Sequence, residues 1–278
     1  MSMQLKKAQR KQVKLRLNLS APSGGGKTYS ALLMAKGLVG DWSKVAVIDT
    51  ENGSASLYSH LGDFNVIDFA PPHTPERYIE AITACIEAGI ECIIIDSTSH
   101  EWSTLIEENE ILANAKYRGN TWSAWSQTTP RHDRFLNAIL HADCHIITCT
   151  RSKTDTVMSD DKKVKKVGMK DQQRDGWEYE LTVSLSIDRD SHYAVASKDR
   201  TNLFEGKNPF IISEKTGQLI KEWCETGKEI ETKDTLTESH PQWGNVKAAL
   251  TKGFTIEQVK VKYKIDSETE KLLTDAKD

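Results

Sequence analysis

The sequence predicts an α/β fold in which helices cover a mainly parallel sheet, followed by a small α-helical module. Apolar segments of strand length alternate along the chain with segments of helical periodicity. A glycine-rich turn lies between the first predicted strand and the first predicted helix. A polar stretch then precedes a last region whose apolar residues again have helical spacing. We therefore expect a core over residues 1–224, a linker over 225–240 and a helical module over 241–278.

The first predicted strand ends in a turn with the composition of a phosphate-binding loop. Apolar residues alternate over 13–19, as in a strand, and residues 29–36 have the character of a helix. Between them, residues 21–28 are APSGGGKT, which has the form of a Walker A motif. Glycines let successive amides face one concavity, and the start of a helix adds a partial positive charge there.

This loop predicts a site for the phosphates of a nucleotide. Lys27 would bridge the β- and γ-phosphates, and the Thr28 hydroxyl would hold Mg²⁺. Ala21 replaces the usual first glycine, and the position needs a small residue more than it needs glycine. The expected nucleotide-binding residues of this segment are Pro22, Ser23, Gly24, Gly25, Gly26, Lys27, Thr28 and Tyr29.

The later elements continue the alternation. Strands are predicted over 44–49, 91–96 and 145–150, and helices over 75–88, 102–115 and 130–140. Thr74 is the expected N-cap of the helix that starts at Pro75. Segments 181–187 and 193–197 alternate in polarity and predict an antiparallel pair, and residues 243–276 predict the helices of the last module.

Two carboxylates complete the predicted site. Asp96 follows the apolar run 93–95, as in a Walker B strand, and would hold Mg²⁺ opposite Thr28. The alternative is an ordinary strand end. Glu51 follows the strand 44–49 and is the candidate base that activates the attacking water. The alternative for Glu51 is a solvated loop carboxylate.

Several segments resemble one family. Residues 48–51 (IDTE) and 94–97 (IIDS) are similar to segments of RecA-type recombinases, whose glutamate is the catalytic base. Residues 197–201 (SKDRT) resemble basic segments of RadA-like recombinases and hexameric RecA-fold helicases, with Asp199 in place of asparagine. Together with residues 173–180, this order of parts looks like the compact RecA-type ATPases of phages and prophages, a group within the AAA-family ATPases. The resemblance covers about residues 12–212.

The resemblance implies roles for further residues. Lys198 and Arg200 would stabilise the charge of the transition state in a neighbouring subunit, so a ring or filament is expected. The alternative is a solvated strand end. Thr148, Thr150 or Arg151, near the end of the fourth predicted strand, would sense the γ-phosphate. The expected catalytic set is therefore Lys27, Glu51, Lys198 and Arg200.

The sequence also suggests a DNA contact. The net charge is −3, which argues against a general polyanion binder. Lysines are concentrated over 162–170, close to Arg174, and the corresponding loop of RecA-like proteins binds single-stranded DNA. The expected contacts are Lys163, Lys165, Lys166 and Arg174. The alternative is a solvated β-hairpin with its turn at residues 160–163.

A second aromatic and basic stretch covers residues 117–125. It contains Tyr117, Arg118, Trp122 and Trp125. Packing of an amphipathic helix or lid explains these residues at least as well as DNA binding does.

These observations lead to three functional hypotheses. The first is an ATPase of phage-type DNA recombination that assembles on single-stranded DNA and promotes annealing or strand pairing. The second is a helicase-like motor or helicase loader, and the third is a nucleotide-dependent switch that binds a protein. No Asn-Lys-x-Asp segment for guanine is present, which favours ATP with Mg²⁺. The C-terminal module would bind DNA or a partner such as a single-strand binding protein.

Composition indicates a cytoplasmic protein without a membrane partner. No apolar run approaches the roughly 20 residues that cross a bilayer, and the N-terminus lacks the apolar region of a secretory signal. The five cysteines form no CxxC pair, so we expect buried free thiols. The histidines near residues 141–145 are not expected to form a metal site, since side chains alternate along a strand.

Overall fold

The computed structural model describes residues 10–158, 164–228 and 234–275. The chain divides into two compact units. The larger unit spans residues 12–227, and the smaller one contains the described residues from 228 onward together with residues 10 and 11.

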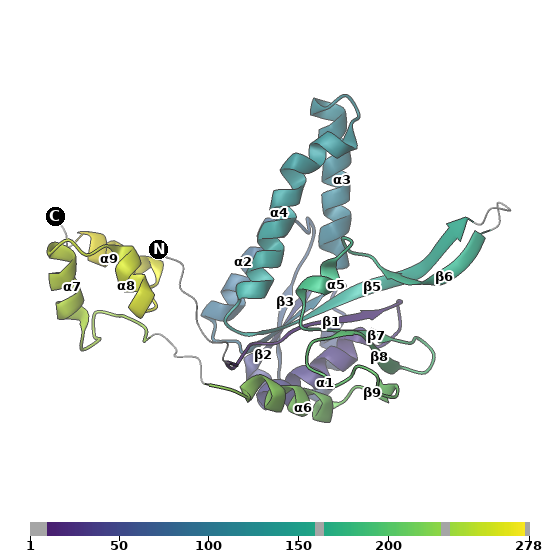
Figure 1. The fold of residues 1–278 in the computed structure, drawn as a ribbon, viewed down its shortest axis with the longest axis horizontal. Helices are drawn as coiled ribbons and strands as arrows, with labels where there is room; N and C mark the ends of the chain where they lie inside the picture. Colours follow the sequence, from purple (N-terminus) through teal and green to yellow (C-terminus); the bar gives the residue numbers. More distant parts are fainter. Residues whose placement is uncertain (1–9, 159–163, 229–233, 276–278) are drawn as a thin grey trace. The chain divides into compact units, whose positions relative to one another are not determined.

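The larger unit is built on one twisted sheet (Figure 1). Along the sheet the strands are β3 (Asn65–Asp68), β2 (Val45–Asp49), β4 (Cys92–Asp96), β5 (His145–Met158), β1 (Arg16–Ala21), β7 (Val183–Ile187), β8 (Tyr193–Asp199) and β9 (Phe210–Ile211). Strands β3 to β7 in this order are parallel, whereas β8 and β9 are antiparallel to their neighbours. Strand β6 (Val164–Asp171) pairs only with β5 and forms a hairpin with it. The predicted α/β fold with a mainly parallel sheet is confirmed.

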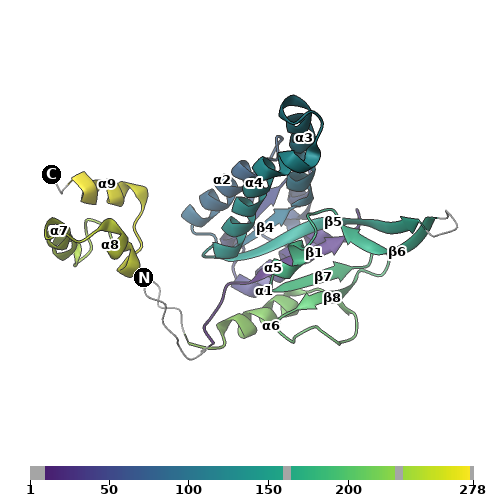
Figure 2. The ribbon, with the colours of Figure 1, turned by 45° about the horizontal axis from the view of Figure 1, so that its top comes forward.

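Helices cover both faces of the sheet, as the continuous apolar strands require. Helices α1 (Lys27–Val39) and α6 (Glu214–Glu225) contribute to the core on one face, and α2 (Pro75–Glu87) and α4 (Thr121–His141) to the core on the other. Strand β4 shows the division clearly, because Ile94 belongs to the first core and Ile93 and Ile95 to the second. Helix α3 (Ser99–Lys116) runs beside α4, and both rise from the sheet as a helical hairpin (Figure 2).

Short elements connect these layers. They are the 3-10 helices η1 (Trp42–Lys44) and η2 (Ala55–Leu61) and the helix α5 (Trp177–Glu180).

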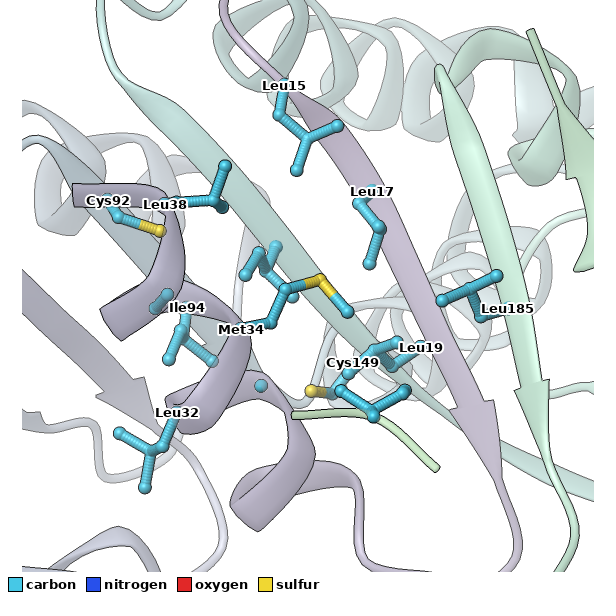
Figure 3. Close-up of a cluster of buried hydrophobic side chains, with 14 of the residues drawn as sticks. Leu15, Leu17, Leu19, Leu32, Met34, Leu38, Cys92, Ile94, Cys149 and Leu185 are labelled. Carbon is cyan, nitrogen blue, oxygen red and sulfur yellow. The ribbon is translucent and has the colours of Figure 1, made fainter. Parts of the chain in front are cut away.

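The core under α1 positions the glycine-rich turn. Leu17 and Leu19 of β1 and Met34 of α1 are fully buried against one another and against Leu185 (Figure 3). Each such side chain contributes roughly 1.5–3 kcal/mol through burial. Strand β1 and helix α1 therefore pack firmly against each other, and this packing fixes the two ends of the turn that joins them.

Two glycines allow α1 and α6 to approach closely. A Cβ atom at Gly37 would lie 2.0 Å from the carbonyl oxygen of Glu214, and one at Gly217 would lie 2.1 Å from that of Met34. Helix axes come this near only where no side chain intervenes. Helix α6, which periodicity alone did not predict, is thus a fixed support of α1.

Some boundaries differ from the prediction. Helix α4 begins at Thr121 and contains Pro130, which was the predicted start. The Asn120 side chain accepts a hydrogen bond from the Ser123 amide at 3.1 Å and caps the earlier start. Thr74 is the N-cap residue of α2, as predicted, but its side chain makes no capping bond. Strands β3 and β9 were not predicted, because their alternation is short, and β6 was expected only in the alternative interpretation of the basic segment as a β-hairpin.

The smaller unit is helical. It contains α7 (Trp243–Thr251), α8 (Ile256–Lys262) and α9 (Ser267–Asp275). Its core includes Val246, Val259 and Leu273, and also the fully buried Leu236. Residues 234–240 therefore belong to this unit, whereas the sequence placed them in a linker. Among the described residues, no helix is both long and apolar enough to cross a membrane.

Candidate nucleotide-binding site

The glycine-rich turn has the backbone geometry of a phosphate cradle. Gly24 and Gly26 have φ angles of 78° and 82°, in the left-handed region that glycine adopts without strain. The Gly25 amide donates to the Pro22 carbonyl at 3.1 Å, and a Cβ atom at Gly25 would lie 2.7 Å from that of Ala21. The turn thus depends on glycine at three successive positions.

Lys27 is the first residue of α1 and lies over the mouth of the turn. Its Nζ atom donates to the carbonyl oxygens of Ala21 at 3.1 Å and Pro22 at 3.3 Å. These carbonyls hold the ammonium group above the turn until an anion binds. The start of α1 adds unpaired amides at the same position, which favours a phosphate.

Thr28 and Asp96 meet across the cavity. The Thr28 hydroxyl donates to a carboxylate oxygen of Asp96 at 2.5 Å. Asp96 is almost fully buried, and this burial raises its pKa to about 6, although the bond from Thr28 and the charge of Lys27 act in the opposite direction. A hydroxyl and a buried carboxylate side by side are oxygen ligands of the kind that Mg²⁺ prefers.

The residues around this pair form a cavity of about 180 Å³. It is lined by Ser23, Gly24, Gly26, Lys27, Thr28, Glu51, Ser54, Tyr58, Asp96 and Arg151. Within the part of the chain that the structure describes, the buried Ser54 hydroxyl has no hydrogen-bond partner. A buried polar atom without a partner is costly, so this hydroxyl fits a polar ligand in the cavity. The residues present therefore fit a nucleotide phosphate with Mg²⁺.

Glu51 lies in this cavity with both carboxylate oxygens on Arg151. The Arg151 Nε atom donates to Oε1 at 2.9 Å, and its Nη2 atom donates to Oε2. The two side chains are partly exposed, Glu51 by 22% and Arg151 by 39%, so water can reach them. Arg151 is in register with Ala21 at the same edge of the sheet, which explains how it reaches the cavity.

Asp49 shapes the loop that carries Glu51. One of its carboxylate oxygens accepts from the Glu51 amide at 2.7 Å, and the other accepts from the Ala55 amide at 2.8 Å. The Thr50 amide donates to the Asp96 carbonyl at 2.7 Å, which ties the loop to β4. Glu51 is therefore held beside the ends of β2 and β4.

Ser54, Tyr58 and His192 are cavity or loop neighbours that the sequence analysis missed. Ser54 precedes η2 and Tyr58 lies in it, and no motif marks either residue. His192 lies in the β7–β8 turn, with its Nδ1 atom 3.5 Å from where a Gly26 Cβ would lie. The segments that carry them connect strands, which was the signal that the sequence offered.

Thr148 does not reach the cavity, and this corrects the prediction. It is fully buried, and its hydroxyl hydrogen-bonds the Leu17 carbonyl and the Asn18 side chain. Thr148 is paired with Ile95 of β4 and with Asn18 of β1, so it lies inside the sheet. Thr150 likewise bonds Asp171 and Asn18, and of the three sensor candidates only Arg151 lines the cavity.

Tyr29 and Pro22 are also outside the cavity lining. Tyr29 is 42% exposed, with its ring 5.8 Å from that of Tyr58. Pro22 contributes its carbonyl oxygen to the turn. Both are neighbours of the site, and their contact with the nucleotide stays a prediction.

Lys198 and Arg200 lie at the opposite end of the sheet. Asp199, between them, is paired with Val183, which is paired with Leu17 near the start of β1, whereas the glycine-rich turn follows the end of β1. Both side chains donate to the Tyr179 carbonyl. Burial lowers the pKa of Lys198, and the charge of Arg200 acts in the same direction. They cannot act on a nucleotide in their own subunit, and a role in a neighbouring subunit stays a prediction.

The predicted DNA contacts fall around the β5–β6 hairpin. Lys163 lies outside the described residues, and Lys165 and Lys166 belong to β6, so the backbone has the hairpin geometry of the alternative interpretation. Arg174 donates to Asp133 at 3.0 Å.

All five cysteines are buried free thiols, as predicted.

The parallel sheet, the glycine-rich turn and the Thr28–Asp96 pair at its edge define a P-loop NTPase. The AAA domain family matches residues 13–210, and the chain belongs to this family. A search of curated proteins found no match.

Proposed function

We propose that this protein is a RecA-type ATPase of phage origin, which hydrolyses ATP to ADP and phosphate while assembled on single-stranded DNA in recombination or annealing. The observation that carries the ATPase part is the position of Glu51 in the same small cavity as Lys27, Thr28 and Asp96. A P-loop that only binds nucleotide does not need a carboxylate at this place.

The chain's own groups have separable tasks in the reaction. The amides of the turn and the Lys27 ammonium bind the phosphates and position the γ-phosphoryl group. Thr28 and Asp96 would hold Mg²⁺, which would supply positive charge against the charge that develops on the phosphate oxygens. The Ser54 hydroxyl gains a partner when the cavity is filled, so its burial favours the bound state.

Glu51 orients the attacking water and accepts its proton. In the structure both carboxylate oxygens are bound by Arg151, so the base is occupied. A γ-phosphate brings negative charge that competes for the guanidinium, and a phosphate binds arginine as well as a carboxylate does. Arg151 would then move to the phosphate and leave Glu51 free for water.

The position of Lys198 and Arg200 supports the proposal of self-assembly. They lie at the end of the sheet far from their own cavity, and a heterologous contact would bring one subunit's cations to its neighbour's nucleotide. Such contacts generate a ring or a filament. The oligomer is therefore proposed together with the trans role of these two residues.

The DNA part rests on the resemblance and on the basic hairpin that leaves the sheet beside the cavity. Strand β5 carries Arg151 and continues into this hairpin, so a DNA strand bound there would be connected to the base. The motor and protein-switch hypotheses share the cavity and differ in what the hairpin contacts.

The test is the steady-state rate of ATP hydrolysis with and without single-stranded DNA, using Glu51→Gln as the blank. We expect DNA to increase the hydrolysis rate of the unaltered protein. We expect no hydrolysis by Glu51→Gln. A rate that ignores DNA would leave the ATPase in place and remove its proposed partner. Unwinding of a forked duplex would instead support the motor hypothesis.

A further inference from the structure

A second and larger hollow lies between the α3–α4 helical hairpin and the β5–β6 hairpin. Its volume is about 1160 Å³, more than six times that of the nucleotide cavity. Residues that line it include Trp102, Trp122, Trp125, Lys153, Lys170 and Arg174. We call it the tryptophan groove. None of the proposed ATPase steps uses it.

One wall of the groove presents aromatic rings. Trp102 and Trp125 are stacked with their ring centroids 5.3 Å apart and their planes at 18°. Trp122 is 84% exposed, although tryptophan has a large, mainly apolar side chain that is usually mostly buried. A tryptophan left this open, beside a stacked pair and in a hollow, is typical of a binding surface.

The facing wall carries positive charge. Lys153 and Lys170 are exposed, and Arg174 is partly exposed. Lys170 pairs with Asp175 at 2.8 Å and Arg174 with Asp133 at 3.0 Å, and exposed pairs of this kind are weak enough for another anion to displace. Asp171 is engaged with Ser20 and Thr150, so its charge is directed toward the sheet.

We propose that the tryptophan groove binds single-stranded nucleic acid. Trp122 and the Trp102–Trp125 stack would support unstacked bases, while Lys153, Lys170 and Arg174 contact the phosphates. Aromatic faces opposite cations match a strand that alternates flat bases with charged phosphates. An apolar peptide would use the rings but would gain nothing from the cations. This inference rests on the proposed function, because it names where the DNA of that function lies.

The groove is joined to the nucleotide cavity through hydrogen bonds. The Gln172 amide, in the groove wall, donates to the Arg151 carbonyl at 2.7 Å. Gln173 donates from its side chain to the Thr98 carbonyl at 3.0 Å, next to Ser99, whose hydroxyl accepts from the Arg151 amide at 2.9 Å. A strand that moves this wall therefore acts on the residue that holds Glu51. Stimulation of hydrolysis by DNA follows from that connection.

The experiment measures binding of fluorescein-labelled oligothymidylate by anisotropy, with the full chain and its variants at low salt. Trp122→Leu keeps an apolar side chain but removes the aromatic face, and it should weaken binding about tenfold. Trp122→Phe restores a face and should bind nearly as the unaltered protein does. Lys153→Glu should lower the salt dependence of log Kd by about 0.7 per lost phosphate contact.

Controls come from the same helical hairpin. Ile111 is 68% exposed and Lys116 is exposed, and neither lines the groove, so Ile111→Ala and Lys116→Glu should leave binding unchanged. ATP hydrolysis without DNA should be the same in every variant, which shows that each one folds.

The outcomes separate the two proposals. Equal binding by Trp122→Leu and the unaltered protein would overturn the groove as the site while DNA binding itself stands. Equal losses in Trp122→Leu and Trp122→Phe would overturn base stacking. An unaltered protein that binds no oligothymidylate but hydrolyses ATP would overturn both the DNA partner and the groove's occupant, and would favour a peptide ligand.

Discussion

The nucleotide cavity and the tryptophan groove are built from different parts of the same unit. The cavity is small and lies where parallel strands end, with Asp96 almost fully buried and its partners within hydrogen-bond distance. The groove is large and lies between two hairpins that leave the sheet, with Trp122 almost fully exposed. Chemistry on a phosphate needs fixed geometry, whereas a flexible strand needs accessible faces and charges. Changes in the cavity should therefore abolish nucleotide binding or hydrolysis, whereas changes in the groove should weaken DNA binding by degrees.

The largest effect is expected from Lys27→Ala. This change removes charge-assisted hydrogen bonds to the phosphates, and it should weaken binding of Mg-ATP by ~100-fold or more. Lys36→Ala at the other end of α1, where Nζ bonds the Gly40 carbonyl, is the matched control. Calorimetric titration with a non-hydrolysable analogue measures both. Equal affinities in the two variants would show that the ammonium does not contact the phosphates.

The close contact between α1 and α6 should not tolerate a side chain at Gly217. In Gly217→Ala the new Cβ would lie 2.1 Å from the Met34 carbonyl oxygen, so α6 must move away from α1. We expect a loss of about 3 kcal/mol or more in the free energy of unfolding. Gly244→Ala in α7 meets nothing within 4 Å and should be neutral or stabilising. Chemical denaturation of both variants measures the difference, and equal midpoints would contradict the close helix contact.

The burial of Asp96 makes stability depend on pH. Its pKa is about 6 in the folded protein against 3.8 ordinarily, so between these values the folded state holds a proton that the unfolded state has lost. Stability therefore falls as pH rises through this window, by up to about 3 kcal/mol without ligand.

Asp96→Asn removes this dependence. It should raise the free energy of unfolding by about 1–3 kcal/mol at neutral pH and have little effect below pH ~4. Asp68→Asn, at the exposed end of β3, is the control. Thermal unfolding across pH measures the effect, and equal stabilisation at both ends of the range would refute the burial argument.

The smallest effect is expected at the start of α4. Asn120→Ala removes the side-chain cap of α4 and should cost about 1 kcal/mol. Thr74→Ala, at an N-cap position whose side chain makes no capping bond, should cost less. Equal losses of stability in the two variants would show that the cap bond contributes nothing.

The cavity was more predictable from sequence than the groove for a physical reason. Lys27, Thr28 and Asp96 belong to local patterns, since strand ends of a parallel sheet meet at one edge and the turn is continuous in sequence. The cavity edge also brought Glu51 and Arg151 together, although their mutual pairing was not foreseen. Trp122 and Lys153 come together only through the packing of two hairpins, so no spacing in the sequence connects them.

Errors of the sequence analysis arose where strand register or the start of a helix decides a residue's position. Thr148 is paired with Ile95 and Asn18 inside the sheet, so its hydroxyl bonds β1 and does not reach the cavity. Pro130 lies inside α4 and not at its start, because the Asn120 cap starts the helix at Thr121. Lys198 near the end of β8 and Arg200 just after it lie at the opposite end of the sheet, because β8 runs antiparallel to β7, and their role in a neighbouring subunit stays a prediction.

The central claim is that Glu51 is the base in a working nucleotide site. Its most direct test is single-turnover hydrolysis of bound Mg-ATP by the unaltered protein and by Glu51→Gln, with the affinity for the nucleotide measured alongside. We predict that affinity changes little while the hydrolysis rate falls ~100-fold or more, as for the loss of a general base. Hydrolysis by Glu51→Gln at the unaltered rate would contradict the account.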